Sequence, residues 1–168
     1  MCPQDDHPEP ETVDSEIEFR VVPADDRDAV ALIGAMVEEM RVLYDGLDLE
    51  AGDMPKAGPA ELGPPHGAFV VGYLHGRAVC GGGVKRLPDG VAEIKRMYVV
   101  PDLRGRGVAR ALLARLEDEA RSLGYSVVRL DTGERQPQAI HLYGSAGYRE
   151  IANYNDNPAA GWFGEKQL

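Results

Sequence analysis

Apolar side chains recur at two spacings along this chain, and these spacings separate predicted strands from predicted helices. Three neighbouring runs have the composition of strands, at residues 68–74, 78–85 and 91–99. They are joined by His75-Gly76-Arg77 and by Leu87-Pro88-Asp89-Gly90, and both joins have the residues of hairpin turns. The pattern therefore predicts a three-stranded antiparallel meander in the middle of the chain.

Two longer segments have the spacing of amphipathic helices. From Val108 to Leu123 apolar residues recur on one face and charged residues fill the other, and Gly124 then ends the predicted helix. An earlier helix is predicted after Pro23-Ala24-Asp25, either as one helix or as two with a break near Gly34. Its apolar stripe consists of Ala29, Val30, Ile33, Met36, Val37, Met40, Leu43 and Tyr44.

The other segments complete a mixed sheet. Further strands are predicted at residues 17–22, 126–131, 148–152 and 162–166, and a short helix at 137–145. Residues 45–66 are rich in glycine and proline, so we expect a long irregular connection that is either functional or mobile. A meander followed by a strand, helix, strand crossover predicts an α/β domain, whose mixed, mostly antiparallel sheet is flanked by helices.

Length and charge bound the function classes. The 168 residues and the hydrophobic content of 43% suit a single domain, which we place at residues 17–168. The net charge of −10 is uneven, because residues 1–16 contain six acidic residues and no Lys or Arg. We expect this tail to be disordered, since it has few apolar groups to bury. The remainder has 22 acidic and 18 basic residues, which argues against nucleic-acid binding.

Membrane, disulfide and metal signals are weak in this sequence. No apolar run approaches the ~20 residues that a membrane span needs, and the acidic start is unlike a secretory signal. We therefore expect a cytoplasmic protein that does not bind membranes. Cys2 lies in the tail and Cys80 in an apolar run, so a disulfide framework is not expected. The four histidines are far apart without ligand-like spacing, and we expect no metal site.

The segment from Val99 to Ala109 joins a strand-like run to the long helix through a turn of small residues. Gly105 and Gly107 remove the Cβ atoms that would keep a ligand away from the backbone. The N-terminus of the following helix offers unpaired N–H groups and a positive dipole end, and Arg104 and Arg106 add positive charge. The turn predicts a phosphate site, although a tight connection without a ligand would use the same residues.

The order of these parts resembles the GNAT superfamily of acyl-CoA-dependent N-acetyltransferases over about residues 17–168. The family signature is Arg or Gln, two residues, Gly, one residue, then Gly or Ala. It is matched here by Arg104, Gly105, Arg106, Gly107, Val108 and Ala109. The resemblance implies that these residues bind the pyrophosphate of coenzyme A. A second family pattern is matched by Gln136, Ala139, Leu142, Tyr143, Gly147 and Tyr148, with Gln136 where an Asn that holds the pantetheine arm is common.

The resemblance implies transfer of an acetyl group from acetyl-CoA to a primary amine by direct attack. An amine with a pKa of about 10 is mostly protonated near neutral pH, so a base is needed. Glu93, on the strand that leads to the turn, resembles the general-base glutamate of some members, and a hydrophobic cleft would raise its pKa. Tyr143 stands at the family's position for the acid that protonates the CoA thiolate. Without these roles, Glu93 would pair with Lys95 or Arg129, and Tyr143 would pack under the sheet.

The resemblance also implies a splayed strand pair that binds CoA. Met97, Tyr98 and Val99 would hold the pantetheine and the thioester, and the N–H of Tyr98 or Val99 would stabilise the oxyanion. A bulge would part the two strands, and we expect it within residues 96–98. Residues 153–158 either line the acceptor cleft or form a polar turn, and we expect Trp162 to pack on the sheet.

Two other functions fit the same residues: a CoA-binding sensor or scaffold without turnover, and a different nucleotide-dependent transferase. Members of the resembled family acetylate antibiotics, polyamines, amino acids, peptide N-termini and protein lysines, so the expected acceptor is a small-molecule, peptide or protein amine. Acidic residues of the first helix and the following loop either favour a cationic small molecule or form a solvated face: Glu38, Glu39, Asp45, Asp48, Glu50 and Asp53. Homodimers are common among the proteins that this sequence resembles.

Overall fold

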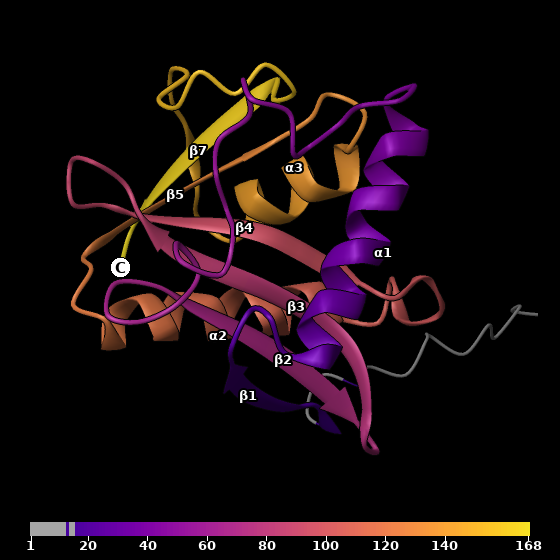
Figure 1. Ribbon diagram of the computed structural model, residues 1–168. Helices are drawn as coiled ribbons and strands as arrows, with labels where there is room; N and C mark the ends of the chain where they lie inside the picture. Colours follow the sequence, from indigo (N-terminus) through magenta and orange to yellow (C-terminus); the bar gives the residue numbers. More distant parts are fainter. Residues whose placement is uncertain (1–12, 14–15) are drawn as a thin grey trace, which may run out of the picture.

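Seven strands form one sheet in the computed structural model, which describes residue 13 and residues 16–168 (Figure 1). The order across the sheet is β1-β2-β3-β4-β5-β7-β6, and β4 and β5 are its parallel pair. The strands are β1 Glu18–Val22, β2 Ala68–Leu74, β3 Arg77–Arg86, β4 Ala92–Val99, β5 Val127–Thr132, β6 Arg149–Glu150 and β7 Trp162–Gln167. The helices of the described residues are α1 Arg27–Leu43, the 3-10 helix η2 Pro101–Leu103, α2 Val108–Ser122 and α3 Pro137–Ser145. The predicted fold class is confirmed.

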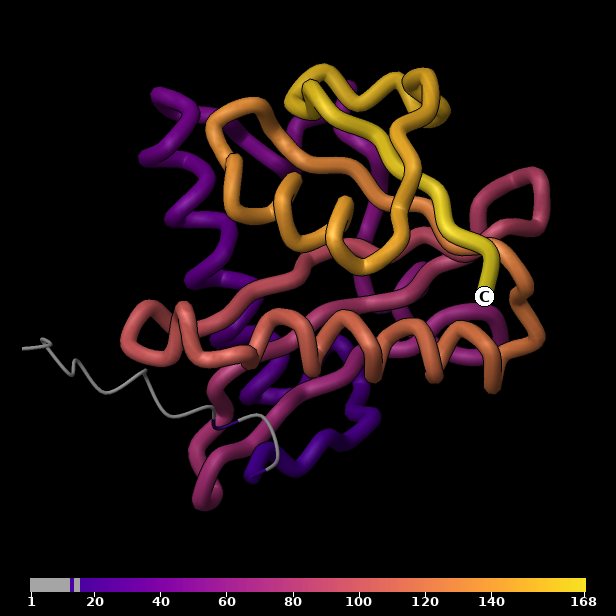
Figure 2. Tube along the Cα trace, turned by 180° about the vertical axis from the view of Figure 1, so that it is seen from behind, coloured from indigo at the N-terminus to yellow at the C-terminus, as the bar shows by residue number. Residues whose placement is uncertain are grey.

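Helices cover both faces of the sheet. Alternate residues of a strand point to opposite faces. Accordingly, Phe69 and Val71 of β2 belong to the hydrophobic cluster that contains Leu32 of α1, whereas Val70 belongs to the cluster that contains Leu112 of α2. Figure 2, from behind, shows α2 and α3 on the face turned away from α1. The molecule therefore has two apolar layers, one on each side of the central strands.

α1 is one continuous helix, capped at its start by the side chain of Asp26, with no break near Gly34. Its buried residues are Ala29, Leu32, Met36 and Met40. The predicted place of Val30 in the apolar stripe is wrong, because this side chain is 54% exposed. Val30 lies about 100° around the helix axis from Ala29, and Leu32 completes the stripe instead.

β4 contains a bulge inside the segment where we expect one. The register between β3 and β4 shifts between Gly81 and Gly83, which leaves Arg96 and Met97 opposite Gly82. Arg96 has a left-handed backbone, with a φ of +60°. A Cβ atom on Gly82 would lie 3.1 Å from Cγ of Met97, so glycine at this position makes room for the bulged strand.

β4 and β5 are paired only near their starts, where Ala92 is in register with Val128 and Glu93 with Arg129. Beyond these two positions β5 stays paired with β7, while β4 leads away to η2 and α2 (Figure 1). The second halves of β4 and β5 are therefore separated, as predicted for a splayed pair. The backbone groups of β4 that face this gap have no strand partner in the sheet order.

Two expectations about irregular segments have different outcomes. Residues 45–66 contain turns and bends without a helix or strand, as predicted. The strand predicted at 148–152 is shorter, because β6 covers only Arg149–Glu150. Ile151 makes one further backbone hydrogen bond to the carbonyl of Phe163, at 2.9 Å, before the chain leaves the sheet.

The predicted disordered tail, residues 1–16, lies outside the described residues except for Val13 and Glu16. Val13 is buried in the core, and its N–H donates to the carbonyl oxygen of Arg106 at 3.3 Å. Among the described residues, no helix has both the length and the apolar character to cross a bilayer.

Candidate functional site

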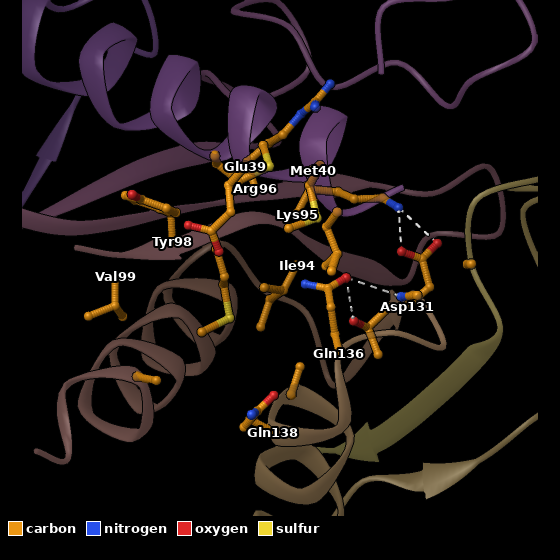
Figure 3. Close-up of a pocket in the computed structure, with 18 of the residues that line it drawn as sticks. Glu39, Met40, Ile94, Lys95, Arg96, Tyr98, Val99, Asp131, Gln136 and Gln138 are labelled. Atoms are coloured by element: carbon orange, nitrogen blue, oxygen red, sulfur yellow. Dashed lines mark hydrogen bonds and ion pairs between the residues drawn. The ribbon is translucent and has the colours of Figure 1, made fainter. Parts of the chain in front are cut away.

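A cleft of about 880 Å³ opens where β4 and β5 separate (Figure 3). α1 and the loop after it, one face of α3 and the start of α2 contribute its walls. Most of the site residues predicted from the sequence line it: Met97, Tyr98, Val99, Arg104, Gly105, Gly107, Val108, Ala109, Gln136 and Tyr143. Two other predicted site residues, Glu93 and Arg106, are not part of its wall in the described chain.

The turn before α2 has the geometry of an anion site. Gly105 and Gly107 have φ values of +76° and +84°, a left-handed backbone that other residues rarely adopt. A Cβ atom on Gly105 would meet nothing within 4 Å, so this side of the turn is open to a ligand. α2 starts directly after Gly107 without a side-chain cap, which leaves its first N–H groups available. The turn therefore fits a diphosphate, whose charge the helix N-terminus would stabilise.

Arg104 lines the cleft, but its guanidinium is bound to protein groups. Its Nε donates to the carbonyl oxygen of Val99 at 2.9 Å, and Nη2 donates to Oε2 of Glu39 at 2.7 Å. The guanidinium carbon also lies 5.3 Å from the centre of the Tyr98 ring. Arg104 thus ties α1 to the end of β4, and a direct contact between Arg104 and a phosphate stays a prediction.

Tyr143 combines packing with access to the cleft. Its ring stacks on Trp162 and meets the edge of Tyr148, with 5.9 Å between ring centres in both pairs. Trp162 therefore packs against the core of the domain, as expected, and its stacking fixes the orientation of the Tyr143 phenol. The hydroxyl group of Tyr143 lies 3.9 Å from Sδ of Met97, and burial raises the pKa of this phenol. Tyr143 accordingly keeps its proton throughout the neutral pH range.

Gln136 holds the turn between β5 and α3. Its Oε1 accepts hydrogen bonds from the Thr132 hydroxyl at 3.2 Å, from the N–H of Gly133 at 3.3 Å and from the Tyr44 hydroxyl at 3.4 Å. Figure 3 shows its amide nitrogen directed toward Ile94, inside the cleft. Gln136 can therefore offer an amide N–H to a bound ligand, in spite of being a Gln where the family pattern has Asn.

Glu93 lies beside the cleft rather than in its wall. Its side chain is 0% exposed, and Oε2 accepts a hydrogen bond from Nδ2 of Asn155 at 3.0 Å. Oε1 has no hydrogen-bond partner among the described residues, and it lies 3.7 Å from Nζ of Lys95 and 4.0 Å from Nζ of Lys85. Pairing with Lys95 agrees with the non-catalytic alternative, and a direct catalytic role for Glu93 stays a prediction.

Asp131, near the end of β5, is the carboxylate next to Glu93 that does line the cleft. Both of its oxygens lie 2.9 Å from Nζ of Lys95 (Figure 3). Oδ2 also accepts hydrogen bonds from Asn155 at 2.6 Å and from Asn157 at 3.1 Å. Asn155 thus bridges the two carboxylates through one amide group. The loop at 153–158 does contribute to the cleft, because Asn157 is part of its wall.

Sequence reasoning missed five charged residues of the cleft wall: Lys95, Arg96, Arg110, Asp131 and Arg135. One signal for Asp131 was available, since it is an acidic residue at the carboxyl end of a buried strand, where a splayed sheet opens. Lys95 and Arg96 gave no such signal, because consecutive residues of a regular strand point to opposite faces. Both line the same cleft only because the bulge at Arg96 interrupts the alternation.

Known proteins resemble this chain in both sequence and fold. The Acetyltransferase (GNAT) family model matches residues 35–148. The chain is 37% identical over 139 residues to an IAA acetyltransferase of Azospirillum brasilense, covering 75% of this chain and 88% of that relative. A Klebsiella pneumoniae protein described as an acyl-CoA N-acyltransferase superposes with a TM-score of 0.70 at 30% identity, over 90% of this chain and 97% of that one. A GNAT family acetyltransferase of Elizabethkingia anophelis with acetyl-CoA bound has a TM-score of 0.65 at 14% identity, over 92% and 99% of the two chains, which shows a shared fold.

Proposed function

This chain belongs to the GNAT family of acetyltransferases, and on that premise we propose that it acetylates a primary amine by direct attack on acetyl-CoA. Acetyl-CoA is the co-substrate, since the family uses it as the acetyl donor. The observation that carries the proposal is the cleft itself. One continuous cavity joins the open glycine turn at Gly105 to the buried phenol of Tyr143, along the unpaired side of β4.

The chain supplies binding, a proton donor and backbone donors. When bound, acetyl-CoA supplies a thioester that an uncharged amine can attack. Tyr143 holds a proton at its hydroxyl oxygen and can give it to the departing thiolate, because burial keeps this phenol protonated. The N–H of Val99 faces the gap between the strands, because the N–H of the next residue, Val100, donates to the carbonyl of Val79 in β3. It can donate a hydrogen bond to the pantetheine arm or to the thioester oxygen. α2 and the glycine turn hold the diphosphate.

We assign the base function to Asp131, with Glu93 as the carboxylate beside it. Glu93 has no access to the cleft, whereas Asp131 lines it, and Asn155 contacts both carboxylates. Lys95 lies between the same two groups, at 3.7 Å from Glu93 and 2.9 Å from Asp131. In this arrangement Asp131 meets the ammonium group of the acceptor, and Glu93 is a positioning residue that sets the charge of the cluster.

Direct attack, without an acetylated enzyme, is supported by the position of Cys80. This thiol is fully buried, is not part of the cleft wall, and has a pKa that burial raises to about 12. A protonated thiol outside the cleft is a poor acetyl carrier.

Thiol release from acetyl-CoA, measured over a panel of amines, tests this function. We expect release that depends on both the enzyme and the amine, and no mass gain of one acetyl group when the enzyme is mixed with acetyl-CoA alone. Binding of acetyl-CoA without thiol release for any amine would contradict catalysis and would support a sensor or scaffold. A stable acetyl-enzyme would contradict direct attack.

A further inference from the structure

The part of the cleft beyond β4, toward α1 and the loop after it, is strongly apolar. The side chains that line this part are Met36, Met40, Leu43, Leu47, Leu49, Met54 and Pro55. The loop that contributes four of them lies within the irregular segment 45–66, which folds over the end of the cleft. An acceptor that fills this region therefore needs an apolar group.

Arg96 brings a positive charge into this apolar region. Its side chain is 9% exposed and lines the cleft, and its backbone has a φ of +60° at the bulge. Its ion pair is long, at 3.4 Å from Nη2 to Oε1 of Glu50, and the Glu50 side chain is 74% exposed. Burial lowers the pKa of the Arg96 guanidinium, because the surrounding protein replaces water without supplying a close counter-charge. A left-handed backbone at a non-glycine residue is also a costly feature that clusters at functional sites.

The other cations of the cleft wall have closer polar partners. Each is within 3.0 Å of one: Lys95 with Asp131, Arg104 with Glu39, Arg110 with Ser145 and Arg135 with Asp45. Among the cations that line the cleft, Arg96 is thus the one whose guanidinium has most bonding capacity left for a ligand.

Most of the acidic residues of this region already have a cationic partner. Several of those named in the sequence are already paired with arginines: Glu38 with Arg41, Glu39 with Arg104, Asp45 with Arg135 and Glu50 with Arg96. A polyamine or other polycation would have to compete with these arginines. An anionic group on the acceptor could replace Glu50 as the partner of Arg96, since Glu50 is at the surface and can move away.

We propose that the acceptor is an amine that carries a carboxylate and an apolar group, and that Arg96 binds this carboxylate. α-Amino acids with apolar side chains have this chemistry. A guanidinium holds a carboxylate through two parallel hydrogen bonds, so the pair also orients the acceptor. This inference rests on the proposed function and names the substrate class of the same site.

Matched acceptors test the proposal with the unmodified enzyme. Thiol release from acetyl-CoA is measured with L-phenylalanine, L-leucine and L-methionine, each compared with its amide and with the amine that lacks the carboxyl group. We expect kcat/KM for each acid to exceed that for its amide by about tenfold or more, since a buried guanidinium would be left without its anion. The comparison is stringent, because an amino acid amide has more of its amine in the reactive neutral form.

Variants assign the effect to Arg96. In Arg96→Gln we expect the ratio of kcat/KM for the acid to kcat/KM for its amide to fall to about one. In Arg96→Lys this ratio should take an intermediate value, because a lysine keeps the charge but cannot form two parallel hydrogen bonds to the carboxylate. Arg41→Gln is the matched control, since Arg41 is an exposed arginine of α1 that is outside the cleft wall. Its acid to amide ratio should equal that of the parent. Acetyl-CoA affinity, measured by calorimetry, should be the same in all four proteins.

The outcomes separate this inference from the proposed function. If amides or simple amines are acetylated as well as the acids, or if Arg96→Gln keeps the preference for acids, the carboxylate assignment is wrong while acetyl transfer stands. If acetyl-CoA binds and no amine of any class causes thiol release, the proposed function fails, and this inference with it.

Discussion

The hydroxyl group of Tyr143 lies 3.9 Å from the sulfur atom of Met97, which joins α3 to the bulged part of β4. Trp162 stacks on the other side of the Tyr143 ring and fixes where the phenol points. The contact marks the place in the cleft where a proton donor and the unpaired side of β4 meet. We therefore put the reacting sulfur at this point.

Tyr143→Phe removes the proton donor and keeps the ring that packs between Trp162 and Tyr148. We expect kcat to fall by about a hundredfold or more, the range for loss of a general acid, with acetyl-CoA affinity within a few-fold of the parent. Tyr125→Phe is the control, because Tyr125 donates to the carbonyl of His66 and is not in the cleft wall. Equal turnover in Tyr143→Phe and the parent would remove the acid assignment.

Gly105→Ala tests the anion site. The new Cβ atom would occupy the open side of the turn, so we expect KM for acetyl-CoA to rise by about tenfold, in addition to a stability cost of about 1–2 kcal/mol for the left-handed backbone. Gly124→Ala is matched to it, since Gly124 also has a positive φ and open space around its Cβ position, at the far end of α2. It should lose similar stability and keep its KM. A KM that rises equally in both variants would show a general loss of structure.

Asp131→Asn and Glu93→Gln separate the two carboxylates by steady-state kinetics. We expect Asp131→Asn to lower kcat by about a hundredfold with acetyl-CoA affinity within a few-fold of the parent, because the group that accepts the proton is lost. Glu93→Gln should lower kcat less, since it changes the charge next to Asp131 and leaves the proton acceptor in place. Turnover of Asp131→Asn equal to that of the parent would exclude Asp131 as the base.

Cys80 provides a pH-dependent test of the buried core. Burial raises the pKa of its thiol to about 12 from an ordinary value of 9.0, so the folded state keeps its proton where the unfolded state loses it. This group therefore lowers stability as the pH rises above about 9, and it has no such effect at lower pH. At pH 8 we expect iodoacetamide to alkylate Cys80 about a thousandfold more slowly in the folded than in the urea-unfolded protein, measured in a Cys2→Ser background. Rapid alkylation in the folded state would contradict the burial of this thiol.

Locally determined features could be predicted from the sequence. The hairpin at His75 and Gly76 has positive φ values at both residues, as a two-residue hairpin turn requires. The turn at Gly105 and Gly107 could be predicted as a phosphate site from its small residues and the helix that follows, and both glycines have a left-handed backbone. Tyr143, which the family pattern singles out, lines the same cleft as this turn.

Features that depend on distant parts of the chain could not be predicted. Arg96 enters the cleft because Gly82 of the neighbouring strand allows a bulge in β4. The register between two strands depends on both of them, so the sequence of β4 alone does not predict this bulge. The surroundings of Asp131 could not be predicted, because Asn155 and Asn157 fold back onto it from a loop that has the sequence of an ordinary polar turn. The burial of Glu93 could not be predicted either, because the sequence of a strand does not show which other segments cover each of its faces. Asn155, Lys85 and Lys95 lie around this carboxylate.

A crystal structure of the protein with acetyl-CoA tests the central claim most directly. We predict that the diphosphate accepts hydrogen bonds from backbone N–H groups of residues 105–109, and that the thioester sulfur lies within about 4 Å of the Tyr143 hydroxyl. A diphosphate bound elsewhere, or a sulfur atom held far from Tyr143 with the turn at Gly105 empty, would contradict this account.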